Sequence, residues 1–221
     1  MKRSVSTLLA IGLVLGFSAS AAHATTLGSA VQPPGSAPNA CPPNSVIAQS
    51  TSDPSTPYSA PGAGTITEWQ IDTSLATPGA PVTMVVLKPT GGDFSVVGTD
   101  SRTIPAAGSI ATFLLSTAIN VSGGETLGLY TNGAPVVCYW NGGSTPAGDT
   151  LAGLVANSPP ASGQTLSRAT SDSPSGYTMN LAARFVPAAA PPPQTKKKKC
   201  KKKKKRSAQS AKKKCKKKKK G

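Results

Sequence analysis

The sequence of 221 residues contains only one histidine, His23. The chain begins with the basic residues Lys2 and Arg3, followed by an uncharged run of ten mostly apolar residues at 8–17. His23 lies after this run, within the small-residue motif AHA at 22–24. This order predicts a signal peptide over residues 1–24, because the apolar run is too short to span a membrane, which takes about 20 residues. A mature chain that begins at Thr25 would have no imidazole, which excludes Ser-His-Asp and Cys-His catalysis and every zinc site that uses histidine.

Enzyme signatures are also missing. The sequence has no glycine-rich phosphate loop, no GxSxG elbow and no Cys/His set with metal-ligand spacing. A glycosidase needs two carboxylates, one with a raised pKa, and nothing in the sequence singles out a pair among the eight scattered acidic residues. We therefore expect a non-enzymatic protein; the alternative from another class is a secreted hydrolase that acts on cell-wall glycans.

Long hydrophobic runs are absent after the signal peptide. The segment before the tail, at 185–190, is short and is followed by three prolines, so the sequence shows no stop-transfer anchor. We expect a protein that is not transmembrane and that is secreted, either extracellular or associated with the cell envelope.

Aromatic residues make up only 5% of the chain, too few for an extended sugar-stacking surface. The best local candidate for a glycan ligand of the body is the segment CYWNGG, which contains Tyr139, Trp140 and Asn141. If Cys138 is buried, strand alternation places Trp140 on the same inward side and turns Tyr139 outward. Trp140 is then either a residue that caps the core or a weak ligand-site candidate.

Acidic residues are missing from the last 26 residues, which contain 17 lysines and Arg206 and so carry a charge of +18. Residues 25–195 contain eight acids and four cations, a net charge of −4. Such a lysine run repels itself and buries nothing, so we expect a disordered tail after a Pro/Ala-rich linker. The expected electrostatic binding residues are Lys196, Lys197, Lys198, Lys199, Lys201, Lys202, Lys203, Lys204, Lys205, Arg206, Lys212, Lys213, Lys214, Lys216, Lys217, Lys218, Lys219 and Lys220.

The middle of the chain consists of short β-branched runs separated by Gly, Pro, Asn and Asp, with no capped helical period. This texture predicts an all-β protein with a single antiparallel β-sandwich or jelly-roll-like domain and disordered termini. Strands are expected at 45–49, 64–72, 81–88, 94–98, 110–116, 126–131, 135–140, 164–168 and 177–185, with a weaker one at 150–155. The expected organisation is a signal peptide at 1–24, a loosely ordered Pro/Gly/Ser-rich lead-in at 25–44, the β-sandwich at 45–186, the linker at 187–195 and the polylysine tail at 196–221.

One of these segments, at 65–72, alternates as a half-buried strand should. Alternation places Thr65, Thr67, Trp69 and Ile71 on one face and Ile66, Glu68, Gln70 and Asp72 on the wetter face. Trp69 is therefore expected to be a core residue rather than a sugar platform.

The four cysteines form two pairs by position. Cys41 and Cys138 lie in the body, and an oxidising compartment favours a disulfide between them. Cys200 and Cys215 lie in the tail, where flanking lysines lower the thiol pKa and make both reactive. Three states of the tail pair stay open: an intramolecular loop, cross-links to other chains, and free thiols.

No cofactor is expected, although a structural calcium ion would suit loop carboxylates. Asp93, Asp100, Asp149 and Asp172 lie in loop-like sequence, but none has the Asp-x-Asp density of a dedicated site. Solvated surface acids are the favoured interpretation.

Several segments together resemble a known group of proteins. These are YSAPGAGTITEWQI at 58–71, GGETLGLYT at 123–131, the strand that carries Cys138, and the Lys-rich tail. They are similar to secreted proteins of high-GC Gram-positive (actinobacterial) bacteria, in which a β-sandwich precedes a polybasic C-terminus. The resemblance implies fold and location, and it supplies no catalytic residue.

Three interpretations of the tail remain: a solubility appendage, a nucleic-acid-binding segment, and an anchor to anionic polymers. A signal peptide argues against a physiological nucleic-acid partner, and the tail has no aromatic residue on which bases could stack. We therefore expect a secreted binding or structural module whose tail holds it to anionic envelope polymers or lipid headgroups.

Overall fold

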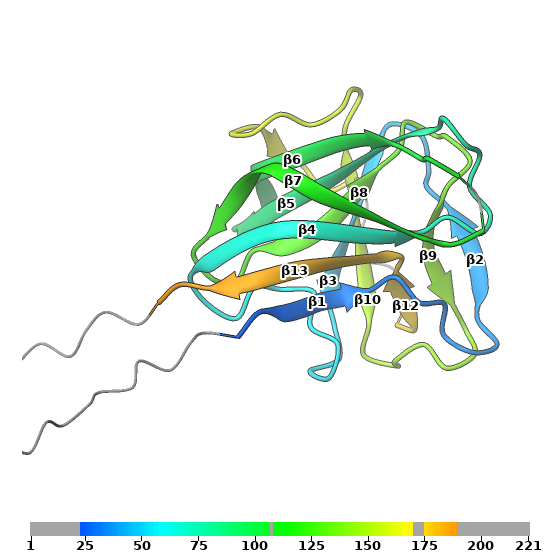
Figure 1. The fold of residues 1–221 in the computed structure, drawn as a ribbon, viewed down its shortest axis with the longest axis horizontal. Helices are drawn as coiled ribbons and strands as arrows, with labels where there is room; N and C mark the ends of the chain where they lie inside the picture. The colour runs from blue at the N-terminus through cyan, green and yellow to red at the C-terminus, as the bar shows by residue number, and fades with distance from the viewer. Residues whose placement is uncertain (1–22, 107, 170–174, 190–221) are drawn as a thin grey trace, which may run out of the picture. The chain divides into compact units, whose positions relative to one another are not determined.

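A computed structural model describes residues 23–106, 108–169 and 175–189 of the chain (Figure 1). These ranges contain thirteen β-strands and no helix. The strands are β1 (Thr25–Ser29), β2 (Ala37–Ala40), β3 (Ser45–Thr51), β4 (Gly64–Asp72), β5 (Pro81–Thr90), β6 (Asp93–Thr103), β7 (Ile110–Val121), β8 (Thr126–Tyr130), β9 (Val137–Asn141), β10 (Thr150–Val155), β11 (Thr165–Leu166), β12 (Tyr177–Met179) and β13 (Leu181–Pro187). The described ranges contain no helical segment with the length and hydrophobicity of a membrane span.

The strands form three antiparallel sheets, so the predicted all-β class is confirmed. A four-stranded sheet has the order β1-β13-β4-β7, a six-stranded sheet the order β10-β3-β8-β5-β6-β11, and a three-stranded sheet the order β12-β9-β2. The four-stranded sheet lies in front of the six-stranded sheet in Figure 1, as in a β-sandwich.

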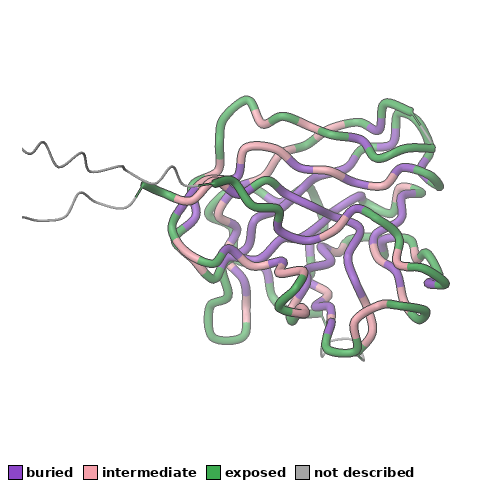
Figure 2. The backbone as a smooth tube through the Cα atoms, turned by 60° about the horizontal axis from the view of Figure 1, so that its bottom comes forward, coloured by how far each residue is buried: buried purple, intermediate pink, exposed green. Residues whose placement is uncertain are grey.

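The main core lies between the two larger sheets, and Figure 2 shows that most residues in the interior of the domain are buried. The four-stranded sheet contributes Trp69, Ile71 and Phe185, and the six-stranded sheet contributes Met84 and Leu129, each no more than 1% exposed. The prediction that Trp69 is a core residue is confirmed.

The six-stranded sheet also has a second core on its other face, which includes Val85, Phe94 and Leu166. Part of its cover comes from the segment after β10, where Arg168 lies 5.2 Å above the ring of Phe94. Because both faces of this sheet are buried, residues 82–87 of β5 are all buried. Buried and exposed residues therefore do not alternate along this part of the strand.

The prediction of a loosely ordered lead-in at residues 25–44 is wrong, because this segment contains β1 and β2. β1 pairs with β13 and buries Leu27, and β2 pairs with β9. The prolines of this segment do not prevent pairing, since both strands lie at sheet edges, where a missing N–H is tolerated. The ordered sandwich therefore begins at Thr25 and not at residue 45.

Most expected strands are present with shifted ends. β4 and β10 have the predicted bounds, whereas β6 and β7 are several residues longer than predicted. The expected strand 177–185 is divided at Asn180, and its halves belong to different sheets. At this break the side-chain amide of Asn180 accepts a hydrogen bond from the backbone N–H of Asp72 at 2.8 Å. Its Nδ2 donates to the carbonyl oxygens of Asp72 at 2.8 Å and Val137 at 2.9 Å.

The predicted faces of β4 are only partly correct. Trp69 and Ile71 are buried together, but Ile66 is also buried at 1% exposure while Thr65 and Thr67 are only half-buried. The register against β7 shifts between Ile66 and Glu68. A bulge of this kind inserts extra residues into one strand and changes which side chains face the core.

The predicted disulfide between Cys41 and Cys138 is confirmed. It joins positions 97 residues apart, and both cysteines are buried. The bond fixes the end of β2 to β9 within the three-stranded sheet.

The described chain enters and leaves the sandwich at the same end. Thr25 of β1 pairs with Phe185 of β13, and Pro187 pairs with Gly64. The strands β2, β9 and β12 lie at the opposite end in Figure 1.

Candidate functional site

The polybasic tail is the predicted electrostatic site, and it lies outside the described residues. The same holds for Cys200 and Cys215, for Asp172 and for most of the predicted signal peptide. The structure therefore bears on the body of the chain, where the candidates were Tyr139, Trp140 and Asn141 on β9.

Trp140 does not lie on the surface. It is 1% exposed and shares the inward side of β9 with Cys138, as predicted from alternation. It is therefore unavailable to a ligand, which leaves Tyr139 and Asn141, both half-buried on the opposite side of the strand.

The two strands beside β9 add further side chains to this face. In the register of the three-stranded sheet, Tyr139 pairs with Asn39 of β2, and Asn141 pairs with Tyr177 of β12. Residues directly opposite in antiparallel strands project from the same side of the sheet. We call the four residues Asn39, Tyr139, Asn141 and Tyr177 the tyrosine–asparagine face.

The side chains of the tyrosine–asparagine face contact one another. The rings of Tyr139 and Tyr177 have centroids 5.8 Å apart with planes tilted by 51°. The Nδ2 atom of Asn39 donates to Oδ1 of Asn141 at 3.0 Å and to the carbonyl oxygen of Ala37 at 3.1 Å. Burial, and after it the neighbouring Tyr177, raise the pKa of the Tyr139 hydroxyl, so this phenol is neutral at physiological pH.

Sequence reasoning missed Asn39 and Tyr177 for an identifiable reason. Asn39 lay in the segment predicted to be a loose lead-in, and Tyr177 lay at the start of a strand predicted to continue to residue 185. The signal that could have found Asn39 is the disulfide, because Cys41 must bring its neighbours close to the strand that carries Cys138.

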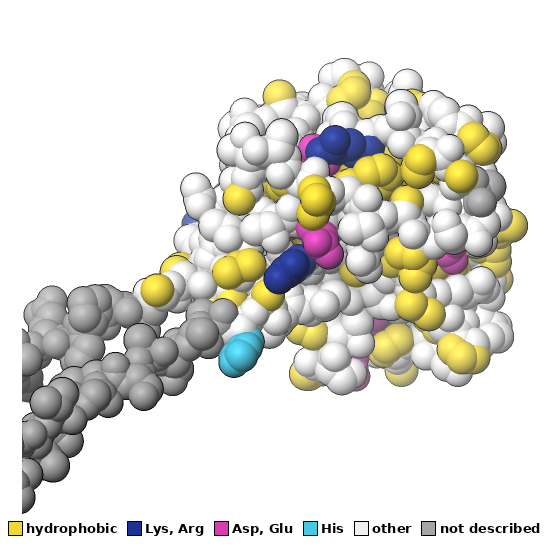
Figure 3. All heavy atoms as spheres, in the orientation of Figure 1, with side chains coloured by type: hydrophobic (Ala, Val, Ile, Leu, Met, Phe, Trp, Pro, Cys, Tyr) yellow, Lys and Arg dark blue, Asp and Glu magenta, His cyan; other side chains and the backbone are white. Residues whose placement is uncertain are grey.

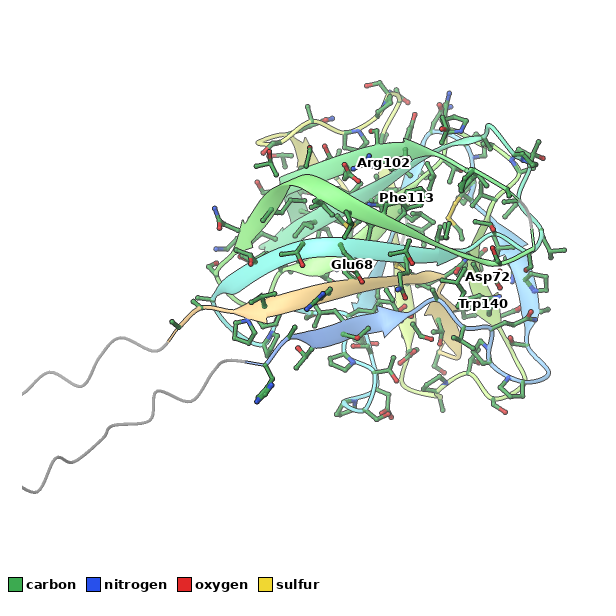
Figure 4. All side chains as sticks on the ribbon, in the orientation of Figure 1. Glu68, Asp72, Arg102, Phe113 and Trp140 are labelled. Atoms are coloured by element: carbon green, nitrogen blue, oxygen red, sulfur yellow. A yellow bond between two sulfur atoms is a disulfide. The ribbon has the colours of Figure 1, made fainter. Side chains whose placement is uncertain are left out.

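A second feature is a polar hollow of about 300 Å³ on the outer face of the four-stranded sheet. Glu68, Gln70 and Arg184 line it together with the start of β1, and Arg184 Nη1 lies 3.9 Å from Glu68 Oε2. This outer face carries few charged side chains (Figure 3), and Glu68 is labelled on it in Figure 4. A half-solvated outer face of this kind is ordinary for an antiparallel sheet.

Three of the described carboxylates serve the fold itself. Asp100 accepts hydrogen bonds from Nε1 of Trp69 at 2.7 Å and from Nε of Arg102 at 2.8 Å. Asp149, which is fully buried, accepts hydrogen bonds from the backbone of Asp53 and from the hydroxyl of Thr178. Glu125, 3% exposed, is the third.

Glu125 closes the turn between β7 and β8. Its carboxylate accepts hydrogen bonds from the hydroxyl of Ser122 at 2.5 Å and from the backbone N–H groups of Ser122 at 3.1 Å and Gly123 at 2.6 Å. Lys88 Nζ lies 3.8 Å from the same carboxylate.

The acids considered for calcium are not clustered. Asp93 and Asp100 lie within β6 rather than in loops, and Asp149 is buried. Within the part of the chain that the structure describes, no three His, Cys, Asp or Glu residues are grouped so that they could hold a metal ion.

Comparison with known proteins adds no functional assignment. No protein-family model, no curated protein and no solved structure matches the chain.

Proposed function

We propose that the chain is an exported, non-enzymatic binding or structural module of the cell envelope, held to anionic wall polymers or lipid headgroups by its polycationic tail. The observation that carries this proposal is the division of charge. Residues 196–221 hold +18, whereas residues 25–195 hold −4.

The energetics of such a tail favour a polyanionic surface. A lysine near an anionic lipid surface contributes on the order of 1 kcal/mol, so a few engaged lysines suffice for attachment. Lysine is a point charge without the bidentate geometry of arginine. The attachment is therefore strong and poorly selective among anionic polymers.

The body of the protein agrees with this proposal in two respects. β1 begins at Thr25, directly after the predicted cleavage site. The buried disulfide suits an oxidising compartment.

The test compares three forms of the protein in cell fractionation: the full chain, a truncation that ends at Thr195, and a full-length variant with every tail lysine replaced by glutamine. The full chain is expected to be found in the envelope fraction and to elute when salt is added. Release of condensed counterions drives this binding, so its affinity falls steeply as the salt concentration rises. The truncated and glutamine forms are expected folded in the medium.

A matched control replaces the same lysines by arginine, which keeps the charge and should preserve attachment. If the truncated protein stays on the envelope as well as the full chain, or if salt releases neither, the tail is not the anchor. The protein is then held by its body, and the tail is a solubility appendage.

A further inference from the structure

The tyrosine–asparagine face offers two fixed aromatic rings at a sheet surface. Tyr139 and Tyr177 are half-buried and pack against the main core, so their ring positions are set by the fold. Tyrosine supplies amphipathic contact area at a low cost in conformational entropy. The part of each ring that stays exposed can accept the apolar C–H face of a ligand.

The two asparagines supply a donor and an acceptor side by side. Asn39 uses both N–H groups of its amide on Asn141 and on the carbonyl of Ala37, which leaves its own oxygen as an acceptor. A carbonyl oxygen cannot donate, so the contact with Ala37 determines this orientation of Asn39. Asn141 must then turn its Oδ1 toward Asn39, which leaves its Nδ2 free to donate to a ligand. Among the described residues, no side chain or backbone group hydrogen-bonds either tyrosine hydroxyl.

The face carries no charge. Its four side chains are two neutral amides and two phenols, and their cross-strand neighbours Ala37 and Met179 are also neutral. An anionic polymer gains nothing from these groups, in contrast to the lysine tail. The groups do match a pyranose or furanose sugar, which has an apolar C–H face and hydroxyls that both donate and accept.

We infer that the tyrosine–asparagine face is a binding subsite for an uncharged sugar unit of an envelope polysaccharide. This inference rests on the proposed function only for the location of the polysaccharide outside the cell. With the tail on an anionic polymer and this face on a neutral one, one molecule can bridge two kinds of envelope polymer. A face this small binds one sugar weakly, with a dissociation constant on the order of millimolar.

The experiment measures retention of the full chain on immobilised neutral polysaccharides: an α-glucan, a β-glucan, a mannan and an arabinogalactan. About 1 M NaCl shortens the Debye length to about 3 Å and removes the contribution of the tail. The wild-type chain is expected to bind at least one of these polymers under this condition.

Two variants test the subsite. Tyr177→Phe keeps the ring and removes the hydroxyl, and it should weaken binding about three- to tenfold, the effect of one lost hydrogen bond. Asn141→Asp keeps the acceptor for Asn39 but removes the outward donor and adds a charge, and it should weaken binding by about tenfold or more. Asn120→Asp makes the same charge change on exposed β7 at the other end and should leave binding unchanged.

Far-UV circular dichroism and a urea unfolding curve confirm that each variant is folded; if Asn141→Asp is not, Tyr139→Phe combined with Tyr177→Phe replaces it. The inference is overturned if the wild-type chain binds none of the four polysaccharides, or if the variants bind as well as the wild type. Retention on anionic wall polymer at low salt, measured in parallel, should be the same for all variants. If the chain is not retained on anionic polymer but still binds a neutral polysaccharide, the proposed tail anchor is contradicted and the sugar subsite is supported.

Discussion

At the scale of single residues, two buried carboxylates show opposite electrostatic behaviour. Burial favours the neutral form of Glu125, but the hydrogen bonds from Ser122 and Gly123 outweigh burial and lower its pKa. Burial also dominates at Asp149, where the hydrogen bonds from Thr178 and Asp53 compensate only in part, so its pKa is raised. Glu125 therefore stabilises the fold as a carboxylate, whereas ionised Asp149 costs stability that its protonation would restore.

Glu125→Gln is expected to destabilise the protein by about 1.5–3 kcal/mol at pH 7, the range for hydrogen bonds to a charged group. Because the folded pKa of Glu125 is below its unfolded value, its contribution is present above about pH 4.3 and is lost as the pH falls through the folded pKa. Urea unfolding at pH 7 and pH 3 should show a large difference between variant and wild type at pH 7 and a small one at pH 3. Glu68→Gln, on the outer sheet face, is the control; an equal loss at both pH values would contradict the prediction.

At the scale of elements, the bulge in the pairing of β4 with β7 decides which residues of β4 enter the core. Simple alternation assigned Ile66 to the wet face, and it would hold if the pairing were regular. The shift between Ile66 and Glu68 instead places Ile66 on the buried side with Trp69. Local alternation is thus reliable only within an uninterrupted run, such as 69–72.

Ile66→Ala should lower the free energy of unfolding by about 2–5 kcal/mol, as for other large-to-small changes in a core. Its neighbour Thr65, half-buried, should tolerate Thr65→Ala within about 1 kcal/mol. Urea unfolding of the two variants gives the comparison. A greater loss for Thr65→Ala than for Ile66→Ala would mean that the bulge is not present in solution.

At the scale of the whole molecule, the disulfide holds the three-stranded sheet together across the chain. Cys41 and Cys138 bring β2 to β9, and that pairing is what places Asn39 beside Asn141. Figure 1 shows that β2, β9 and β12, the strands that carry the tyrosine–asparagine face, lie at the end of the sandwich opposite to the start of β1 and the end of β13.

Replacing both body cysteines by alanine should cost about 2–5 kcal/mol, the usual range for removal of a native disulfide. A loop of about 100 residues is expected near the upper part of this range on the chain-entropy account. In both proteins the tail cysteines are first replaced by serine, so that only the body disulfide differs between them. Chemical unfolding of the two then measures the contribution of this bond to stability. Unchanged stability would show that the pairing of β2 with β9 does not depend on the bond.

Sequence patterns alone predict the all-β class, the approximate positions of β3 to β10, the burial of Trp69, the Cys41–Cys138 pair and the separation of charge. These properties depend on local composition, on alternation over short runs, or on the presence of only two cysteines outside the tail. Four features could be found only in the folded protein: residues 25–44 contain two strands, Ile66 is buried, the chain changes sheets at Asn180, and Asn39 and Tyr177 lie beside Tyr139 and Asn141. The reason is physical: an edge strand is ordered by hydrogen-bond partners that are remote in sequence, 102 residues in the case of Asn39 and Asn141, and a single bulge reverses the alternation on which local pattern analysis depends.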